Sequence, residues 1–259
     1  MEYKEFGIDF ARRAGEIIKR NFGLGMQRQW KSDNTPVTET DLLINRMLIE
    51  EVQKYFPDHD IKGEEEKSLV NNSNYIWVCD PVDGTIPFSH GIPLCTFSLA
   101  LVEDGTPIVG IVYDPFMDRL FFAEKGGGAF LNGQKIAVSD QATLRSSVIN
   151  SEPFHTAKYD ITAILALLEE RGAHATRFAS FVYPGVLVAA GEFLADIFPH
   201  VTAHDVAALK VIVEEAGGKV TDLFGQEQRY DADIEGAIVS NGLIHDELVL
   251  LISAIVARK

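Results

Sequence analysis

The feature that most constrains the fold of this chain is a change of hydrophobic pattern along its length. Near the N-terminus, apolar residues such as Phe6, Phe10 and Ala14 recur at helical spacing, which predicts amphipathic helices. Residues 75–123 instead hold short runs of β-branched and aromatic residues, which predict strands of an antiparallel sheet. From about residue 146, strand and helix patterns alternate. This order predicts an α+β protein whose two halves are built differently.

The expected elements follow from these patterns and from the turn signals between them. Helices are predicted from the N-terminus to near Gly23, after Asp41, and over 160–171, 185–191, 205–215 and 244–257. Strands are predicted over 75–79, 96–102, 108–113, 120–123, 147–150 and 237–240, and at Val220. Residues 24–37 and 57–74 are predicted to be loops. We place a boundary between two predicted domains, residues 1–144 and 145–259.

The charge of the chain bears on the partners open to it. The sequence carries 23 Lys and Arg against 38 Asp and Glu, which gives a net charge of -15. An acidic surface repels nucleic acid, so we expect no nucleic-acid partner. The same charge would repel an anionic substrate unless cations neutralise some of the acids, and this is the first indication of a metal site.

The sequence also indicates the compartment. No apolar run approaches the roughly 20 residues that span a bilayer, and the N-terminus lacks the apolar segment of a signal peptide. Cys79 and Cys95 lie apart and show no CxxC spacing, which is typical of a protein in a reducing compartment. We therefore expect a cytoplasmic protein with no membrane partner.

The strongest local motif is DPVDGT at residues 80–85, directly after the apolar strand 75–79. Pro81 cannot continue a central strand and Gly84 permits unusual backbone angles, so we expect the chain to turn here. Two carboxylates three residues apart at a strand end can reach one point in space, and carboxylates are ligands that Mg²⁺ prefers. The amides of Gly84 and Thr85 are expected to face outward as an anion site. Taken alone, the motif is also consistent with a strand-terminating turn capped by Asp.

Further acidic residues accompany this motif. Glu64, Glu65 and Glu66 form a run just before the strand, Asp41 ends the run TETD, and Asp205 begins an apolar helical pattern. Each group has an ordinary explanation by itself: a solvated loop for the glutamates, and a helix start for each aspartate. Together with DPVDGT, they favour one metal-binding cleft.

The blocks TETD, GEEE, DPVDGTIPFSHGIP and HDVAALKVIVEEAGG resemble the inositol monophosphatase family in their order and spacing over nearly the whole chain. The resemblance implies a layered αβαβα sandwich of the inositol monophosphatase/fructose-1,6-bisphosphatase type, usually dimeric. It also implies Mg²⁺-dependent hydrolysis of a small phosphate monoester, similar to inositol 1-phosphate, by a metal-activated water. A homodimer, two or three Mg²⁺ per active site and a small phosphorylated metabolite as partner are therefore expected.

The same resemblance implies roles for individual residues. For the first metal, the expected ligands are Glu64, Asp80 and the backbone carbonyl of Val82; for the second, they are Asp80, Asp83 and Asp205. Thr85 is expected to accept a proton from the attacking water, with Asp41 holding Thr85 in orientation. Phosphate is expected at the amides of Gly84 and Thr85. The residues expected to support the ligands or to contact substrate are Glu65, Arg177, Ser180 and His204.

The sequence departs from the family pattern in three places. Pro87 stands where the family carries an Asn, and it removes an amide donor. His204 stands where a Trp usually precedes the last metal-binding Asp, either as a packed replacement or as a substrate contact. The acid that inositol-cleaving members carry near residues 198–200 has no obvious counterpart, although Asp196 lies nearby. The missing acid weakens inositol phosphate as the specific substrate, whereas Pro87 affects the conformation of its loop.

Alternative functions remain open at this stage. The position of Arg177 resembles histidinol-phosphate phosphatases, although Phe181 stands where those enzymes carry an acid. Fructose-1,6-bisphosphatase activity is common in related bacterial and archaeal proteins. A catalytically weak regulatory or RNA-polymerase-associated binding protein is the alternative class, and the complete set of acids argues against it. A nucleotide-type 3′-phosphatase is disfavoured because the sequence shows no basic cluster for a second phosphate.

Overall fold

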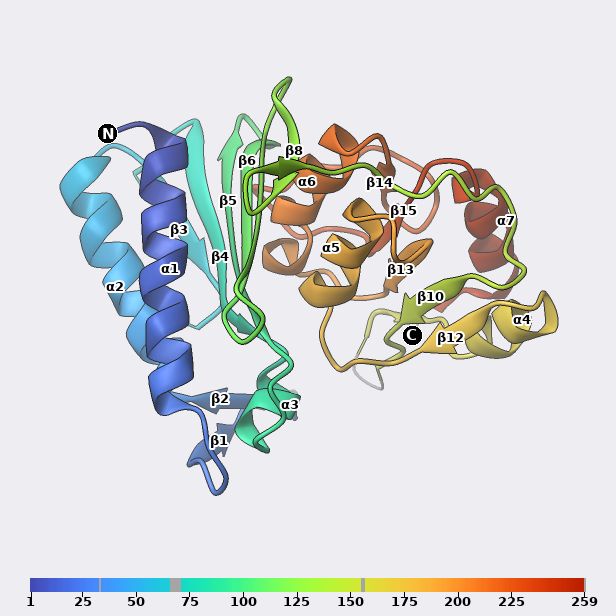
Figure 1. Ribbon diagram of the computed structural model, residues 1–259, viewed down its shortest axis with the longest axis horizontal. Helices are drawn as coiled ribbons and strands as arrows, with labels where there is room; N and C mark the ends of the chain where they lie inside the picture. Colours follow the sequence, from blue (N-terminus) through green and yellow to red (C-terminus); the bar gives the residue numbers. More distant parts are fainter. Residues whose placement is uncertain (33, 66–70, 155–156, 259) are drawn as a thin grey trace.

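The computed structural model arranges the chain in alternating layers of helix and sheet, and it describes residues 1–32, 34–65, 71–154 and 157–258. From left to right, Figure 1 shows two N-terminal helices, a large sheet, a central helical layer, a second sheet and two outer helices. The prediction of an α+β fold with αβαβα layers is confirmed. Within the described ranges, no helix is both long and apolar enough to cross a membrane.

The helices vary in length from one short turn to several turns. They are α1 (Tyr3–Asn21), α2 (Glu39–Tyr55), α3 (Thr85–Ser89), α4 (Ile164–Glu170), α5 (Val182–Ala189), α6 (Ala207–Glu215) and α7 (His245–Ile255), with a 3-10 turn η1 at Ala203–Asp205. In Figure 1, α1 and α2 cover one face of the large sheet, α5 and α6 lie between the two sheets, and α4 and α7 cover the outer face of the second sheet.

The large sheet brings two acidic segments to one edge. Its strands, in spatial order, are β3 (Asp60–Gly63), β4 (Tyr75–Asp83), β5 (Thr96–Glu103), β6 (Thr106–Asp114), β7 (Arg119–Glu124), β8 (Gly128–Leu131) and β9 (Gln134–Lys135). All neighbours are antiparallel except β3 and β4, which are parallel. Gly63 is paired with Cys79 in that parallel register. Glu64 and Asp80, which follow these two residues, therefore emerge side by side.

The second sheet is mixed, and two small ribbons complete the fold. Its spatial order is β12 (His174–Thr176), β10 (Val148–Ser151), β13 (Ala195–Phe198), β15 (Ala237–Ser240) and β14 (Lys219–Thr221). β10 is parallel to β12 and β13, whereas β15 is antiparallel to β13 and β14. The ribbons pair β1 (Arg28–Trp30) with β2 (Pro36–Thr38), and β11 (Tyr159–Asp160) with β16 (Ala257–Arg258).

Three apolar cores hold the layers together. Phe10 and Trp77 lie in the core between the N-terminal helices and the large sheet, Leu209 lies in the core between the two sheets, and Leu248 lies in the core under the outer helices. Because burial of apolar surface drives folding, the central core fixes α6 against the large sheet although α6 comes from the C-terminal half. The boundary between 1–144 and 145–259 stays a prediction.

A glycine sets how closely α6 approaches the large sheet. Gly110 lies in β6, and a Cβ at this position would lie 2.5 Å from the carbonyl oxygen of Ala208. No side chain fits there without movement, since real Cβ atoms do not come this close. The absence of a side chain at Gly110 thus lets the start of α6 rest directly on the sheet, and Asp205 lies just before that start.

The structure differs from the expected elements mostly where loops were predicted. A hairpin of β1 and β2 occupies much of the predicted loop 24–37 and ends at Thr38. β3 lies within 57–74, so the large sheet is mixed rather than antiparallel. Both segments are too short and too polar for clear alternation. β4 also continues through Pro81 to Asp83, because a register shift there leaves no need for the missing N–H of proline.

Candidate active site

The DPVDGT motif forms the end of β4 and the start of α3. Between Asp80 and Asp83, β4 carries one extra residue relative to β5, and a bulge of this kind re-aims the side chains beside it. Gly84 then adopts a φ of 81°, and a Cβ there would lie 2.8 Å from the carbonyl oxygen of Leu94. Both the backbone angle and the lack of space require glycine at this position.

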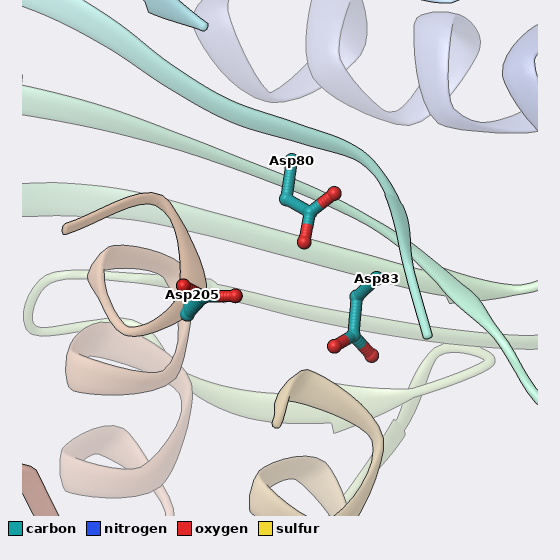
Figure 2. A group of neighbouring side chains, drawn as sticks. All are labelled: Asp80, Asp83 and Asp205. Carbon is teal, nitrogen blue, oxygen red and sulfur yellow. The ribbon is translucent and has the colours of Figure 1, made fainter. Parts of the chain in front are cut away.

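Three buried carboxylates converge at the centre of the site. Figure 2 shows Asp80 and Asp83 from the end of β4 facing Asp205 at the start of the α6 segment. One oxygen of each side chain lies within 4.8 Å of the other two. Burial, and then repulsion by the neighbouring acids, raises the pKa of Asp80 well above its ordinary value. Burial also raises the pKa of Asp205, to about 6, although His204 opposes the shift. These side chains are costly to ionise in the absence of a cation.

Asp83 is held in place by donors from two other segments. Its Oδ1 accepts the amide of Phe181 at 2.8 Å, and its Oδ2 accepts the hydroxyl of Thr96 at 3.0 Å and that of Ser180. Burial raises the pKa of Asp83, while these hydrogen bonds favour its charged form. Ser180 thus supports one of the expected ligands, and the bonds from residues 180–181 tie the start of α5 to the end of β4.

Asp205 ends η1 and is oriented by its own turn. The hydroxyl of Thr202 donates to Asp205 Oδ2, and His204 Nε2 lies 3.4 Å from the same oxygen. The close packing of α6 at Gly110 carries this turn to the edge of the large sheet where β4 ends. His204, which replaces the Trp of the family pattern, therefore stands directly beside an expected metal ligand.

Thr85 and Asp41 are brought together from α3 and α2. The Thr85 hydroxyl lies 2.9 Å from the carbonyl oxygen of Val82 and 3.4 Å from Asp41 Oδ1. The other oxygen of Asp41 accepts the amide of Thr38 at 2.9 Å, which makes a capping box for α2. Burial raises the pKa of Asp41 to about 6. The carbonyl of Val82, expected to bind metal, already accepts the Thr85 hydroxyl and keeps one further lone pair.

The outer glutamates bind a lysine of the chain itself. Lys31 directly follows β1, and its ammonium lies 2.6 Å from Glu64 Oε1 and 2.7 Å from Glu65 Oε1. Burial disfavours the charged form of Glu64, but His204 and Lys31 outweigh it and lower the pKa. Burial, and then repulsion by Glu64, raises the pKa of Glu65 to about 8. A cationic group therefore already occupies the edge where the first metal was expected. Glu66 lies outside the described residues.

Two adjoining hollows, of about 90 and 110 Å³, open over these acids. Both are lined by Thr35, Glu64, Phe154, Phe181 and Asp205. The inner hollow is also lined by the other two aspartates and by the DPVDGT turn, whereas the outer one is lined by His200, Thr202 and His204. The expected metal ligands, the two residues whose amides are expected to bind phosphate, and His204 thus border adjoining parts of one cleft.

The structure does not bring Arg177 to this cleft. Its guanidinium donates to the carbonyl oxygen of Pro153 at 3.2 Å and lies 3.7 Å from Glu152. Glu152 is buried and accepts the amide of Ala179 at 2.8 Å. Arg177 therefore fastens the strand end after β10 to the segment before α5, and it is not among the described residues that line the two hollows. Its contact with substrate stays a prediction.

The donor set of the cleft fits a hard divalent cation. It consists of carboxylate oxygens, which suit Mg²⁺ and similar ions. In the part of the chain that the structure describes, no Lys or Arg pairs with Asp80 or Asp83. The neighbouring acids raise the pKa of Asp80, and a bound cation would remove that repulsion. Asp80, Asp83 and Asp205 can thus hold a metal ion together.

Comparison with known proteins identifies the family. The model of the inositol monophosphatase family matches residues 2–257. The chain belongs to the inositol monophosphatase family. A fructose-1,6-bisphosphatase/inositol-1-monophosphatase of Thermotoga maritima is 34% identical over 99% of this chain and 98% of its own length. A histidinol-phosphatase of Mycobacterium tuberculosis is 31% identical over 95% of this chain and 96% of its own length.

Solved structures of similar proteins share the fold of this chain. An IMPase of Thermotoga maritima superimposes with a TM-score of 0.89 at 33% identity, covering 98% of each chain. The extragenic suppressor protein suhB of Bartonella henselae superimposes with a TM-score of 0.87 at 28% identity, covering 95% of this chain and 96% of that one. The sequence-based recognition of the family is confirmed, and membership makes this chain a phosphatase, a hydrolase of phosphoric monoesters.

Several residues at the site escaped the sequence analysis. Lys31 was hidden in a segment predicted to be a loop, although the turn-forming residues after Trp30 are consistent with a hairpin. Phe154 and Phe181 carry no local signal, because one of many aromatic residues cannot be assigned to a cleft without its tertiary neighbours. The same holds for Thr96 and Thr202, whose hydroxyls orient the expected ligands.

Proposed function

We propose that this protein hydrolyses a small phosphate monoester with Mg²⁺ held in its acidic cleft, in the manner of an inositol 1-phosphate phosphatase. The observation that carries the proposal is the convergence of Asp80, Asp83 and Asp205, whose oxygens lie within 4.8 Å of one another. The Thr85 hydroxyl lines the same hollow. Buried carboxylates of this kind need cations, and two or three Mg²⁺ per site would also neutralise the cleft toward a phosphate.

The residues of the chain divide the remaining work. When bound, the metal ions make water more acidic and stabilise charge on the phosphoryl group. Thr85 accepts a proton from the attacking water and passes its own to Asp41, 3.4 Å away. The amides of Gly84 and Thr85 orient the phosphate. The oxygen of water bonds to phosphorus as the ester bond breaks, and the leaving oxygen takes up a proton, so an alcohol and inorganic phosphate are released.

The substrate is proposed at the level of class. The names of the relatives support inositol phosphates, fructose 1,6-bisphosphate and histidinol phosphate as candidates. The complete set of acids around the cleft disfavours a purely regulatory role. We further propose that the protein acts in the cytoplasm as a homodimer with a phosphorylated metabolite as its partner, in keeping with the family resemblance. Light scattering on the purified protein tests the dimer.

A phosphate-release screen tests the activity. The substrates are inositol 1-phosphate, histidinol phosphate, fructose 1,6-bisphosphate and adenosine 3′,5′-bisphosphate, each with Mg²⁺ and with a chelator in its place. We expect release from at least one monoester with Mg²⁺ and none with chelator. Asp205→Asn is expected to stop release, while the exposed Asp246→Asn serves as matched control. Equal release by Asp205→Asn and wild type would overturn the proposal.

A further inference from the structure

An aromatic wall stands over the acidic cleft. It is formed by Phe154, Phe181 and His200, all of which line the outer hollow. The ring centroids of Phe154 and His200 are 5.0 Å apart with planes at 71°, and those of Phe154 and Phe181 are 5.5 Å apart. The rings of Phe181 and His200 lie 5.9 Å apart at 63°. The two pairs with His200 are edge-to-face, and the planes of Phe154 and Phe181 are tilted by 47°. Contacts of this kind hold the wall in a defined shape.

The wall is fixed relative to the acids. The amide of Phe181 donates to Asp83 Oδ1 at 2.8 Å, so the backbone that carries this ring is tied to an expected metal ligand. Behind it, the Phe181 ring packs edge-to-face on the buried Phe198 at 4.3 Å. His200 also packs on Phe198, at 5.7 Å. A phosphate ester bound at the acids therefore places its organic part against a surface that is already built.

The polar groups near the wall are few. Apart from the carboxylates, the described lining of the outer hollow offers two threonine hydroxyls and the imidazoles of His200 and His204. The hydroxyl of Thr202 already donates to Asp205. A polyol would bring several hydroxyls that need partners when they leave water, and each unpaired one costs affinity. An aromatic ring brings none. Its faces and edges can pack on the wall, which favours a flat apolar group over a polyhydroxylated one.

The described lining also disfavours a second phosphate. Neither hollow includes a Lys or Arg among its described lining residues. Arg177, which directly follows β12, pairs with Glu152 and donates a hydrogen bond to the carbonyl oxygen of Pro153. The chemistry of the cleft therefore matches an ester with one phosphate.

We infer that the substrate is a phosphate monoester whose leaving alcohol carries an aromatic ring, and that Phe154, Phe181 and His200 select it by packing against that ring. The inference rests on the phosphatase activity proposed above. Phe154 and His200 are specificity residues in this assignment, and Phe181 both shapes the wall and positions Asp83.

Paired alkyl phosphates test the inference with the complete enzyme and Mg²⁺. The probes are 2-phenylethyl phosphate and glycerol 1-phosphate, which are both esters of alkyl alcohols. Their leaving groups differ mainly in that one carries an aromatic ring and the other carries hydroxyls. We expect kcat/KM for the phenylethyl ester to exceed that for the glycerol ester by about tenfold. Equal values, or a preference for glycerol phosphate, would overturn the inference and leave the phosphatase activity standing. Release from neither these probes nor the four screened esters would instead overturn the proposed function.

Substitutions in the wall assign the preference to its residues. Phe154→Leu keeps an apolar side chain without a ring, and we expect it to lower the ratio of the two kcat/KM values by about fivefold, mostly through KM. His200→Gln is expected to lower the ratio as well, and it provides a second route if Phe154→Leu folds poorly. The matched control is Phe224→Leu, whose ring packs on Tyr159 away from the cleft. An unchanged ratio in both wall variants, or an equal fall in the control, would contradict the assignment.

Discussion

The inner floor and the outer edge of the cleft are both acidic, but they are built in opposite ways. On the floor, Asp80, Asp83 and Asp205 face one another, and no Lys or Arg among the described residues pairs with Asp80 or Asp83. Hydrogen bonds from the surrounding backbone and hydroxyls hold the three side chains, and His204 lies beside Asp205. At the edge, Glu64 and Glu65 face Lys31, a cation of the chain itself. The floor is thus prepared for a cation from solution, whereas a metal at the edge must displace an ammonium.

This difference suggests an order of binding. Burial, and then repulsion by the neighbouring acids, raises the pKa of Asp80 in the metal-free protein. A cation that enters the floor relieves the repulsion. A cation at Glu64 gains less, because the pair with Lys31 is lost in exchange. We therefore expect the floor to bind the first ion tightly and the edge to bind a later ion weakly. The predictions below test this contrast.

The largest effect is expected for Asp80→Asn. Turnover should fall at least about a hundredfold, because the variant removes a central ligand. In the metal-free protein, however, Tm should rise by about 2–4 °C, since a chain of this size gains that much when about 1 kcal/mol of repulsion is removed. Mg²⁺ should raise the Tm of wild type but not of the variant. Calorimetric scans with and without Mg²⁺ measure both shifts.

Asp246→Asn is the control for that experiment, because the Asp246 side chain is 89% exposed and pairs with Lys219 at 3.2 Å on the surface. It should change neither turnover nor the response of Tm to Mg²⁺. A metal-free Asp80→Asn protein that melts below wild type would show that the floor carboxylates do not repel one another.

Gly110→Ala should uncouple the floor from the sheet. Its new methyl group would meet the carbonyl of Ala208, so α6 must move and carry Asp205 away from β4. We expect a loss of about 1–3 kcal/mol in stability and Mg²⁺ binding weakened about tenfold or more. Gly15→Ala is the matched control, because a Cβ at Gly15 would lie 2.3 Å from the Tyr113 ring under α1. Similar Mg²⁺ affinities in the two variants, measured by titration calorimetry, would rule out this role of α6.

A smaller effect is expected at the edge. Lys31→Met removes the ammonium that pairs with Glu64 and Glu65. The apparent affinity of the edge for the more weakly bound Mg²⁺ should therefore rise by about two- to tenfold. Titration calorimetry resolves that ion from the tighter one. Lys219→Met, which breaks a surface pair with Asp246, is the control and should leave both affinities unchanged. Weaker binding in Lys31→Met would mean that the lysine assists the edge site rather than competing with the metal.

The smallest effect is expected far from the cleft, at His245. This imidazole lies 2.9 Å from the hydroxyl of Thr221 and 2.7 Å from that of Ser240, and burial lowers its pKa to about 4. Between about pH 6.5 and 4, His245 is protonated in the unfolded chain but neutral in the folded state. The free energy of unfolding therefore falls as the pH is lowered through this range. His245→Gln should reduce that fall by about 1–2 kcal/mol in Mg²⁺-loaded protein. Denaturant unfolding at pH 7 and pH 5 measures the change in the free energy of unfolding. An equal change in wild type and variant would contradict the lowered pKa of His245.

Much of the fold was predictable because strong periodic patterns survive in long elements. α1, β5 and α6 fall close to their expected ranges, since each presents one or more continuous apolar faces. The short strands β1 to β3 were missed, because three or four residues carry no period that can be recognised. The bulge after Asp80 was not predicted, because a proline within a strand pattern normally indicates that the strand ends there.

The sequence by itself determined that four acidic blocks belong to one family and one kind of chemistry, because the motifs state residue type and spacing directly. Only the tertiary structure decided how those acids are divided between a floor and an edge. The parallel pairing of β3 with β4 and the close approach of α6 at Gly110 bring distant carboxylates together. The hairpin that carries Lys31 and the wall of Phe154, Phe181 and His200 depend on contacts across layers, which no local pattern encodes.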